Sequence, residues 1–323
     1  MLASLTEKQR ELVRLFNQKV RDGVLATERV TCLCGSSHAA RVAEYDWYGL
    51  WSPVVICRSC GLIYADRRMT VEASRGFYSS DEYRRIYEGE GDLLQKAVAR
   101  FDGKYGGHIF EALHPEMAAR GFSTVAEVGC AAGWNLVHFI ERGYRAVGYD
   151  YSSTLVALGQ SRGIDVKTGS VDDVIGSFDA IILNHVLEHL PRPIDSLRLL
   201  SQHLNPGGIM YIAVPNIDNF GVGQLQNAHI YYFSPRTFVR YLAVAGLKLL
   251  TFGPAERIHM YGIFEPAPRL PLAHPSKPEY PFMQRKILKA RAREGVLNIL
   301  DRVGVGETAR TLYRRLLRRA ENP

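Results

Sequence analysis

The chain has 323 residues, of which 46% are hydrophobic and 23% charged, and its formal net charge is +7. This mixture excludes an intrinsically disordered chain, and no apolar run approaches the roughly 20 residues of a membrane-spanning helix. The first residues are charged and lack an apolar signal core, so we expect a cytoplasmic protein. The excess of positive charge lies in residues 284–323, which hold 11 basic and 4 acidic residues.

The N-terminal region predicts a helix from the start to about residue 28, followed by a small β-rich unit over 30–66. Two cysteine pairs, Cys32/Cys34 and Cys57/Cys60, bracket the β-like stretches and are separated by 22 residues. Two such pairs are typical of a tetrahedral structural zinc site. Because the first pair is spaced C-x-C, His38 is an alternative ligand, and buried free cysteines are the alternative to a metal. Residues 67–120 are mixed, with aromatic side chains at helical spacing.

From residue 124 onward, strands alternate with helices. We expect strands at 124–129, 146–150, 164–167, 178–184 and 208–215, and closing strands at 247–252 and 257–264. Helices are expected at 135–142, 153–162, 193–204 and 234–245. This alternation predicts an α/β fold: a doubly wound, mostly parallel sheet that is covered by helices on both faces.

The C-terminal region changes composition twice. Six prolines between Pro266 and Pro281 predict a stiff, extended linker. Two basic amphipathic helices are expected beyond it, at about 284–303 and 307–319. They could pack on the body of the protein, contact an anionic membrane surface, or bind nucleic acid, and the tail lacks the interleaved aromatic residues of single-strand binders.

The most informative motif is the glycine turn Val125-Ala-Glu-Val-Gly-Cys-Ala-Ala-Gly133 after the first of these strands. Small residues let the backbone approach a ligand, and the following helix offers free N–H groups to an anionic group. Asp150 ends the next strand, where an acid can accept both hydroxyls of a ribose. Ser170 follows the third strand and Asn184 the fourth.

Together these motifs resemble the class I S-adenosylmethionine-dependent methyltransferases over about residues 80–265. The resemblance is carried by Glu127-Val-Gly-Cys-Ala-Ala-Gly133, Asp150, Phe178-Asp-Ala-Ile-Ile-Leu-Asn-His-Val-Leu-Glu-His189 and Leu204-Asn-Pro-Gly-Gly208. It implies a Rossmann-like methyltransferase sheet and an enzyme of the EC 2.1.1 class. Ala131 replaces the middle glycine, and Ser170 stands where an acid is frequent. A nicotinamide-dependent Rossmann enzyme is the alternative, and the Glu before the first Gly argues against it.

The resemblance also implies roles for single residues in binding S-adenosylmethionine. Glu127, Gly129 and Gly133 would hold the methionine end, and Asp150 would hold the ribose. Around the adenine would lie Tyr151, Ser170, Val171 and Asn184. Cys130 belongs to the same turn and is expected to be a small apolar filler rather than a nucleophile.

Methyl transfer to oxygen or carbon needs a base, for which a histidine at the pocket mouth is suited. His229 lies in Asn227-Ala-His-Ile-Tyr-Tyr-Phe-Ser-Pro235, a segment that lines the acceptor site in similar proteins, and is the first candidate. His185 and His189 follow the fourth strand and are the others, and each histidine could instead be structural. Tyr231 and Tyr232 could orient the acceptor.

The N-terminal cysteine unit resembles that of methyltransferases from sugar and secondary-metabolite pathways, in which a small zinc domain precedes the catalytic fold. In the sugar C-methyltransferases of this kind the acceptor is a nucleotide-linked keto-sugar. We therefore expect methyl transfer to an oxygen, or less readily a carbon, of a sugar, glycan or natural product. An RNA-directed methyltransferase or RNA-binding module and a sulfonium-binding protein without catalysis are the alternatives.

The expected organisation has four parts. Residues 1–80 form an N-terminal helix and a zinc-ribbon-like domain, and residues 81–265 form the methyltransferase domain. A proline-rich linker spans 266–283, and basic helices form the tail from 284 to 323. The neutral charge of residues 1–283 disfavours nucleic acid as a partner, because affinity for nucleic acid comes largely from neutralising phosphates.

Overall fold

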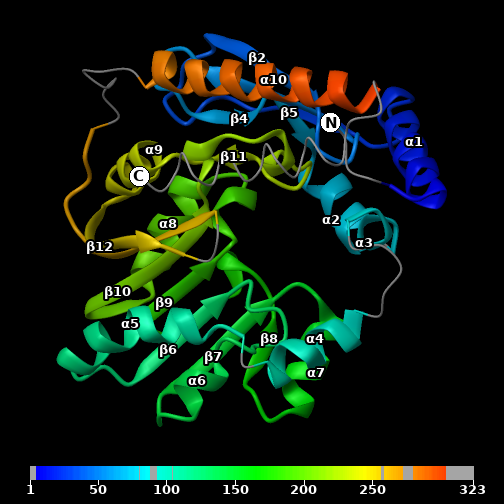
Figure 1. Ribbon diagram of the computed structural model, residues 1–323. Coiled ribbons are helices and arrows are strands. Elements are labelled where there is room, and N and C mark those ends of the chain that lie inside the picture. Colours follow the sequence, from blue (N-terminus) through cyan, green and yellow to red (C-terminus); the bar gives the residue numbers. More distant parts are fainter. Residues whose placement is uncertain are drawn as a thin grey trace.

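The central element is a seven-stranded sheet with the order β12-β13-β10-β9-β6-β7-β8 (Figure 1). The computed structural model describes residues 5–79, 81–87, 93–103, 105–255, 258–271 and 279–302. The strands of this sheet are β6 (Thr124–Val128), β7 (Arg145–Asp150), β8 (Val166–Thr168), β9 (Phe178–Asn184), β10 (Leu204–Pro215), β12 (Leu247–Pro254) and β13 (His259–Pro266). β13 is antiparallel to both of its neighbours, and the other strand pairs are parallel.

Helices cover both faces of this sheet, as the sequence predicted. One face buries side chains of α5 (Gly107–Ala119), α6 (Val137–Ile140) and α7 (Ser153–Ser161). The opposite face buries side chains of α8 (Pro193–Gln202) and α9 (Pro235–Ala245). The short 3₁₀ turns are η1 (Val171–Asp173), η2 (Leu187–His189), η3 (Ile217–Asn219) and η4 (Val222–Gln224). The expected doubly wound, mostly parallel α/β sheet is confirmed.

The N-terminal part begins with α1 (Glu7–Arg21), which Thr6 caps through a reciprocal capping box. The helix ends well before residue 28 because Gly23 adopts φ 74° and a strand follows at Thr27. The small strands are β1 (Thr27–Arg29), β2 (Ala39–Tyr45), β3 (Trp51–Cys57), β4 (Ile63–Ala65) and β5 (Arg67–Met69). The mixed region that follows forms helices, α2 (Val71–Ser79), α3 (Asp81–Tyr87) and α4 (Leu93–Asp102), before α5.

The N-terminal sheet is completed by a strand from far along the chain. β11 (Tyr231–Tyr232) pairs antiparallel with β4, which gives a four-stranded sheet of order β11-β4-β3-β2. One hydrophobic cluster also runs from Cys57 and Leu62 of the N-terminal part to Phe238 of α9. The parts expected at 1–80 and 81–265 therefore share a sheet and a core, as a small unit with little apolar interior requires.

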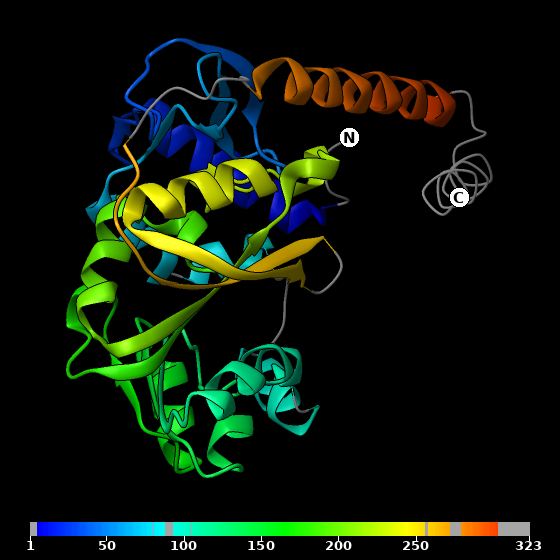
Figure 2. The ribbon, with the colours of Figure 1, turned by 90° about the vertical axis from the view of Figure 1, so that its left-hand side faces the viewer.

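The last described element is α10 (Tyr280–Arg302), which carries Pro281 in its first turn and lies across the N-terminal sheet (Figure 1). Met283 and Ile287 are buried against the four-stranded sheet, and Lys286 pairs with Asp218 at 2.6 Å. Figure 2 shows the far end of α10 extending away from the body. The helix expected at 307–319 lies outside the described residues. Among the described helices, none has the length and apolarity to cross a membrane.

Candidate active site

The residues that the sequence singled out meet along one edge of the large sheet. β6, β7, β8 and β9 run parallel, with Glu127 opposite Ile182 of β9 and Asp150 opposite Thr168 of β8. Their carboxyl ends therefore share an edge, which is where open parallel sheets bind ligands. Because the chain leaves each strand at this edge, the structure brings the glycine turn, Asp150, Ser170 and Asn184 to the same side.

The turn after β6 is built from residues in left-handed conformations. Gly129, Ala131 and Gly133 have φ values of 72°, 53° and 83°. A Cβ atom at Gly129 would lie 2.4 Å from Cγ2 of Val186, so only glycine fits there. Cys130 is buried, and burial raises the pKa of its thiol. A protonated, buried thiol fills space and is a poor nucleophile.

Glu127 is a fully buried carboxyl group just before this turn. Asn135 Nδ2 donates a hydrogen bond of 2.6 Å to its Oε1, whereas Oε2 has no hydrogen-bond partner among the described residues. Burial, helped by the charge of Asp150, outweighs this hydrogen bond and raises the pKa of Glu127 to about 8. An unsatisfied carboxyl oxygen at this position can accept a hydrogen bond from a ligand's ammonium group.

Asp150 ties the end of β7 to the glycine turn. Its Oδ2 accepts from Ala131 N at 2.7 Å, and its Oδ1 accepts from Ser152 N at 2.8 Å. The first bond holds Ala131 in a left-handed conformation that costs an L-residue roughly 1–2 kcal/mol. Each carboxylate oxygen keeps a further lone pair that can accept from a ligand hydroxyl. Tyr151 follows and is 68% exposed, so its ring is available to a ligand.

The other expected cofactor residues follow β8 and β9. Ser170 caps η1, with its N–H and hydroxyl bonded to the Asp173 carboxylate, and is therefore held in place. Val171 is buried in the core. Asn184 is the last residue of β9 and is half-buried. These residues flank the edge at which Asp150 lies.

Histidines gather where β9 ends. His185 has φ 58°, and its Nδ1 lies 3.4 Å from Glu188 Oε1, in a hydrogen bond that the imidazole donates. Its ring contacts that of His259 with centroids 4.2 Å apart. The rings of His189 and His229 lie 4.8 Å apart. The structure thus brings all three histidines expected from the sequence around one glutamate.

The histidines and Glu188 differ in burial, and this difference limits the role that each can have. His229 is only 7% exposed, and burial, with His189 nearby, lowers its pKa to about 3. Glu188 is 1% exposed; burial would raise its pKa, but the hydrogen bond from His185 and the neighbouring imidazoles lower it to about 2. A neutral imidazole and a buried carboxylate therefore lie side by side, and of the three histidines His229 is the least accessible to a substrate.

The tyrosines of β11 serve the N-terminal sheet. The Tyr231 hydroxyl donates to Pro191 O at 3.5 Å, and its side chain is buried in the cluster that contains Cys32. The Tyr232 hydroxyl donates to Gln226 O at 3.0 Å, and its ring, not that of Tyr231, contacts His229. The structure therefore does not bring Tyr231 together with the histidines.

Three site residues were missed by sequence reasoning. Asn135 bonds Glu127, Glu188 bonds His185, and His259 lies at the start of β13 opposite Pro215 of β10. Asn135 and Glu188 lie within motifs that could have suggested them. His259 reaches the site through an antiparallel pairing of distant strands, for which no local signal exists.

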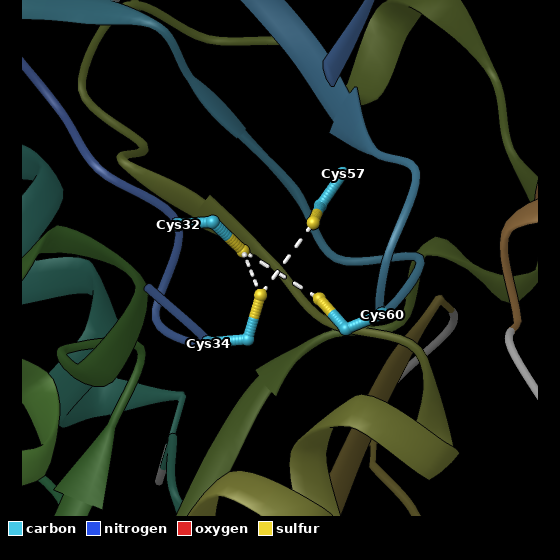
Figure 3. Close-up of side chains that lie close together, drawn as sticks. All are labelled: Cys32, Cys34, Cys57 and Cys60. Carbon is cyan, nitrogen blue, oxygen red and sulfur yellow. Dashed lines mark hydrogen bonds between the residues drawn. The ribbon is translucent and has the colours of Figure 1, made fainter. Parts of the chain in front are cut away.

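The four N-terminal cysteines converge as expected (Figure 3). Sγ of Cys32 lies 3.5 Å from that of Cys60 and 3.5 Å from that of Cys34, and Sγ of Cys34 lies 3.6 Å from that of Cys57. A tetrahedral ion with Zn–S bonds of about 2.3 Å separates its sulfurs by roughly 3.8 Å, so the donor set fits zinc. His38 is exposed and lies outside the cluster.

The thiols of this cysteine cluster contact one another, and one of them also contacts α9. Cys34 Sγ donates to Cys32 Sγ, and the contact with Cys32 lowers the pKa of Cys34 to about 6 and also lowers that of Cys57, whereas the pKa values of Cys32 and Cys60 are raised. A metal ion binds cysteine as the thiolate, the form that the lowered pKa values of Cys34 and Cys57 favour. The Tyr241 hydroxyl of α9 donates to Cys60 Sγ at 3.1 Å, so the cluster also contacts the catalytic fold.

Comparison with known proteins identifies a methyltransferase domain in this chain. A family model described as a methyltransferase domain matches residues 92–251. The trans-aconitate 2-methyltransferase of Deinococcus radiodurans is 31% identical over 110 residues, which cover 32% of this chain and 42% of that protein. A ubiquinone biosynthesis O-methyltransferase of Xanthomonas campestris pv. campestris is 30% identical over 102 residues, which cover 28% of this chain and 43% of that protein. The chain thus spans less than half the length of these curated relatives.

Among solved structures, the 1,6-didemethyltoxoflavin-N1-methyltransferase of Burkholderia thailandensis, determined with S-adenosylhomocysteine, has 16% sequence identity. The match covers 64% of this chain and 96% of that chain, with a TM-score of 0.47.

Proposed function

Residues 92–251 form a class I S-adenosylmethionine-dependent methyltransferase domain, and from this premise we propose that the chain methylates an oxygen of a small acceptor. The proposed acceptor is a sugar, glycan or natural product, with carbon as the less favoured methylated atom. The observation that carries the proposal is the unsatisfied, buried Glu127 Oε2 beside a glycine turn, at the edge where the histidines gather. The relatives' names, one of them an O-methyltransferase, support oxygen as the acceptor atom.

The residues proposed to bind the methyl donor lie at the carboxyl ends of the parallel strands. Glu127 would accept a hydrogen bond from the ammonium group of the methionine end. The glycines of the turn at 129–133 would let the ligand lie close to the backbone. Asp150 would accept from the ribose hydroxyls. Tyr151, Ser170 and Val171 would flank the adenine, and the Asn184 side chain would face its amino group.

The proposed base is His185, with His229 as the second candidate. His185 has a side chain 33% exposed, and Glu188 accepts from its Nδ1 at 3.4 Å, which leaves Nε2 to take a proton. When bound, S-adenosylmethionine supplies the methyl group: the acceptor oxygen forms the O–C bond while the S–C electron pair passes to sulfur, leaving S-adenosylhomocysteine. The proton of the acceptor hydroxyl goes to His185, and the protein otherwise aligns the reactants and excludes water.

We also propose that the cysteine cluster holds one structural zinc ion. The observations in its favour are the sulfur separations near those of a tetrahedral site and the burial of Cys32, Cys57 and Cys60. Zinc would fix the N-terminal sheet beside the segment 227–235, which carries His229, and would leave the chemistry to the sheet edge.

The acceptor class is tested by measuring release of S-adenosylhomocysteine with a panel of acceptors. The panel contains nucleotide-linked sugars, free phenols, carboxylic acids and an RNA oligomer. We expect turnover with a hydroxyl-bearing small molecule and none with RNA. Methylation of RNA alone, with binding that weakens steeply as salt is added, would overturn the proposal in favour of an RNA-directed enzyme.

Replacement of Asp150 by alanine is expected to weaken S-adenosylmethionine binding about 10- to 100-fold, as measured by calorimetry. The change removes a charge-assisted bond to the ribose hydroxyls, worth about 1.5–3 kcal/mol, and releases the Ala131 N–H that the carboxylate holds. Asp165→Ala removes an exposed acid at the opposite end of β8 and is the matched control, which should bind as the wild type does. Equal affinities in the two variants would contradict the ribose assignment.

Binding of S-adenosylmethionine is expected to tighten as the pH rises toward 8. Because the pKa of Glu127 is about 8 in the free protein, its carboxyl group is protonated below that pH, whereas a bound ammonium group favours the carboxylate. Binding therefore releases a proton, and the affinity should increase by up to about tenfold per pH unit below pH 8. Above about pH 8 the ligand's own amino group loses its charge, so the affinity should reach a maximum there.

Calorimetry in two buffers of different ionisation enthalpy measures the released proton directly. The control is Glu127→Gln, which keeps the oxygen that accepts from Asn135 but cannot ionise, and it should lose both the proton release and the pH dependence below 8. A Glu127→Gln variant with the wild-type pH profile would remove Glu127 from the ammonium site.

A further inference from the structure

A second group of metal-ligating side chains lies at the proposed acceptor site, on the η2 turn and the loop before β11. Glu188, His189 and His229 each present one ligand atom, and these atoms lie within 4.8 Å of one another. A divalent ion with bonds of about 2.0–2.2 Å brings its ligands roughly 3–4 Å apart, so small side-chain movements would close this group around an ion. This Glu-His-His cluster is separate from the cysteine cluster.

The hydrogen bonding of His189 fixes which ring nitrogen is free. Its Nδ1 lies 2.9 Å from the carbonyl oxygen of Ala228, so Nδ1 carries the proton and donates. In the neutral ring Nε2 then holds a lone pair, and it points toward Glu188 Oε1 at 3.9 Å. Two hydrogen-bond acceptors, His189 Nε2 and Glu188 Oε1, therefore face each other. A backbone carbonyl behind one ring nitrogen is also the arrangement that orients metal-binding histidines in proteins.

Two members of this Glu-His-His cluster also carry buried polar atoms without a partner in the described part of the chain. Glu188 Oε2 and His229 Nδ1 are buried without a hydrogen-bond partner among the described residues. Both side chains are more than nine-tenths buried, and an unsatisfied buried polar atom is destabilising, more so when the group is charged. A cation bound in this cluster would supply a partner for buried groups of this kind.

The surrounding structure holds the cluster in place before any ion binds. Ile230 N donates to Glu188 O at 2.8 Å, which ties the η2 turn to the loop that carries His229. The N-terminal part fixes the same loop, since Asp46 Oδ2 accepts from Asn227 N at 3.0 Å and Trp51 O accepts from Asn227 Nδ2 at 3.0 Å. The ligand side chains therefore need little reorganisation.

We propose that Glu188, His189 and His229 bind one divalent transition-metal ion that coordinates the acceptor. One carboxylate and two imidazoles form a donor set suited to zinc, manganese, iron(II) or cobalt, and three protein ligands leave coordination positions open. This role rests on the proposed function: the open positions would take acceptor oxygens beside His185, where a cation lowers the pKa of a bound hydroxyl. It also assigns the buried His229 to coordination, which leaves the proton to His185.

The test is a titration of the full-length protein with Mn²⁺, followed by the electron paramagnetic resonance signal of the free ion. Mn²⁺ prefers oxygen and nitrogen donors to thiolates, so zinc in the cysteine cluster is left in place. After dialysis against a mild chelator, the wild type should bind one Mn²⁺ per chain. Glu188→Gln and His189→Ala should weaken binding at least tenfold.

His203→Ala is the matched control, because His203 also contacts a backbone carbonyl, Gly176 O at 2.8 Å, but belongs to the C-cap of α8. It should bind Mn²⁺ as the wild type does. If Glu188→Gln fails to fold in a thermal melt, His189→Ala decides, since the His189 side chain is 37% exposed. If His189 and Glu188 form only an imidazolium–carboxylate ion pair, the wild type should bind no Mn²⁺, and that result would overturn the proposal. Variants that bind Mn²⁺ with unchanged affinity would overturn it too.

Two further measurements on the same samples separate this inference from the proposed function. Calorimetry with S-adenosylmethionine tests the donor site without a metal readout, and release of S-adenosylhomocysteine tests turnover. Metal binding without donor binding would overturn the methyltransferase proposal and leave the metal site standing. Full turnover in a wild type that binds no metal would overturn the metal site alone.

Discussion

The His185→Ala variant is expected to turn over about 10²–10⁴-fold more slowly than the wild type, with an affinity for S-adenosylmethionine within about twofold of normal. The donor contacts proposed here come from β6 and its glycine turn, the end of β7, the segment after β8 and Asn184 of β9. None of them uses the His185 side chain, so removal of this imidazole should affect the proton transfer and little else. The measurement is release of S-adenosylhomocysteine with the acceptor identified by the panel, together with calorimetry for the donor.

The controls for this variant separate a base from a structural histidine. Added imidazole should restore part of the turnover of His185→Ala, because a free base can take the place of the missing ring, whereas it cannot repair a fold. His203→Ala should retain wild-type turnover. A folded His185→Ala protein with near-normal turnover would transfer the role of base to His229.

Replacement of Cys57 by serine is expected to remove the zinc ion and to lower the melting temperature by at least about 10 °C. Structural zinc sites contribute on the order of 10 kcal/mol to folding, and about half of that would produce such a shift in a domain of this size. The effect should extend beyond the N-terminal sheet, because Cys57 belongs to the same core as Phe238 of α9 and Cys60 accepts from Tyr241. Elemental analysis and a thermal melt measure the two effects.

Cys130→Ser is the matched control, because Cys130 lies in the glycine turn, outside the cysteine cluster. It should keep one zinc ion per chain. A wild-type protein without zinc, or a Cys57→Ser protein that retains the ion, would remove the site. A Cys57→Ser variant that loses zinc but melts at the wild-type temperature would confirm the zinc site of the wild type and contradict its structural role.

The sequence by itself determined the large sheet, because the relevant signals are local. Most strands from Thr124 to Asn184 contain a short apolar run, and the turns between strands and helices carry glycine or capping residues such as Ser152. The carboxyl ends of parallel strands share an edge, so the relative positions of Glu127, Asp150 and Asn184 followed from the order of strands alone. The cysteine spacing likewise predicted that the four sulfurs converge, since each pair is tight: one lies in the loop before β2 and the other spans the end of β3 and the turn after it.

The tertiary structure decided what depends on contacts between distant segments. β11 joins the N-terminal sheet and His259 reaches the site through antiparallel pairings, for which the sequence contains no pattern. Burial is also a property of the whole fold: it makes His229 a neutral, enclosed imidazole, leaves His185 accessible, and raises the pKa of Glu127 to about 8. Local sequence thus predicted the types of residue at the sheet edge, whereas the packing of the folded chain around them determined their charge and exposure.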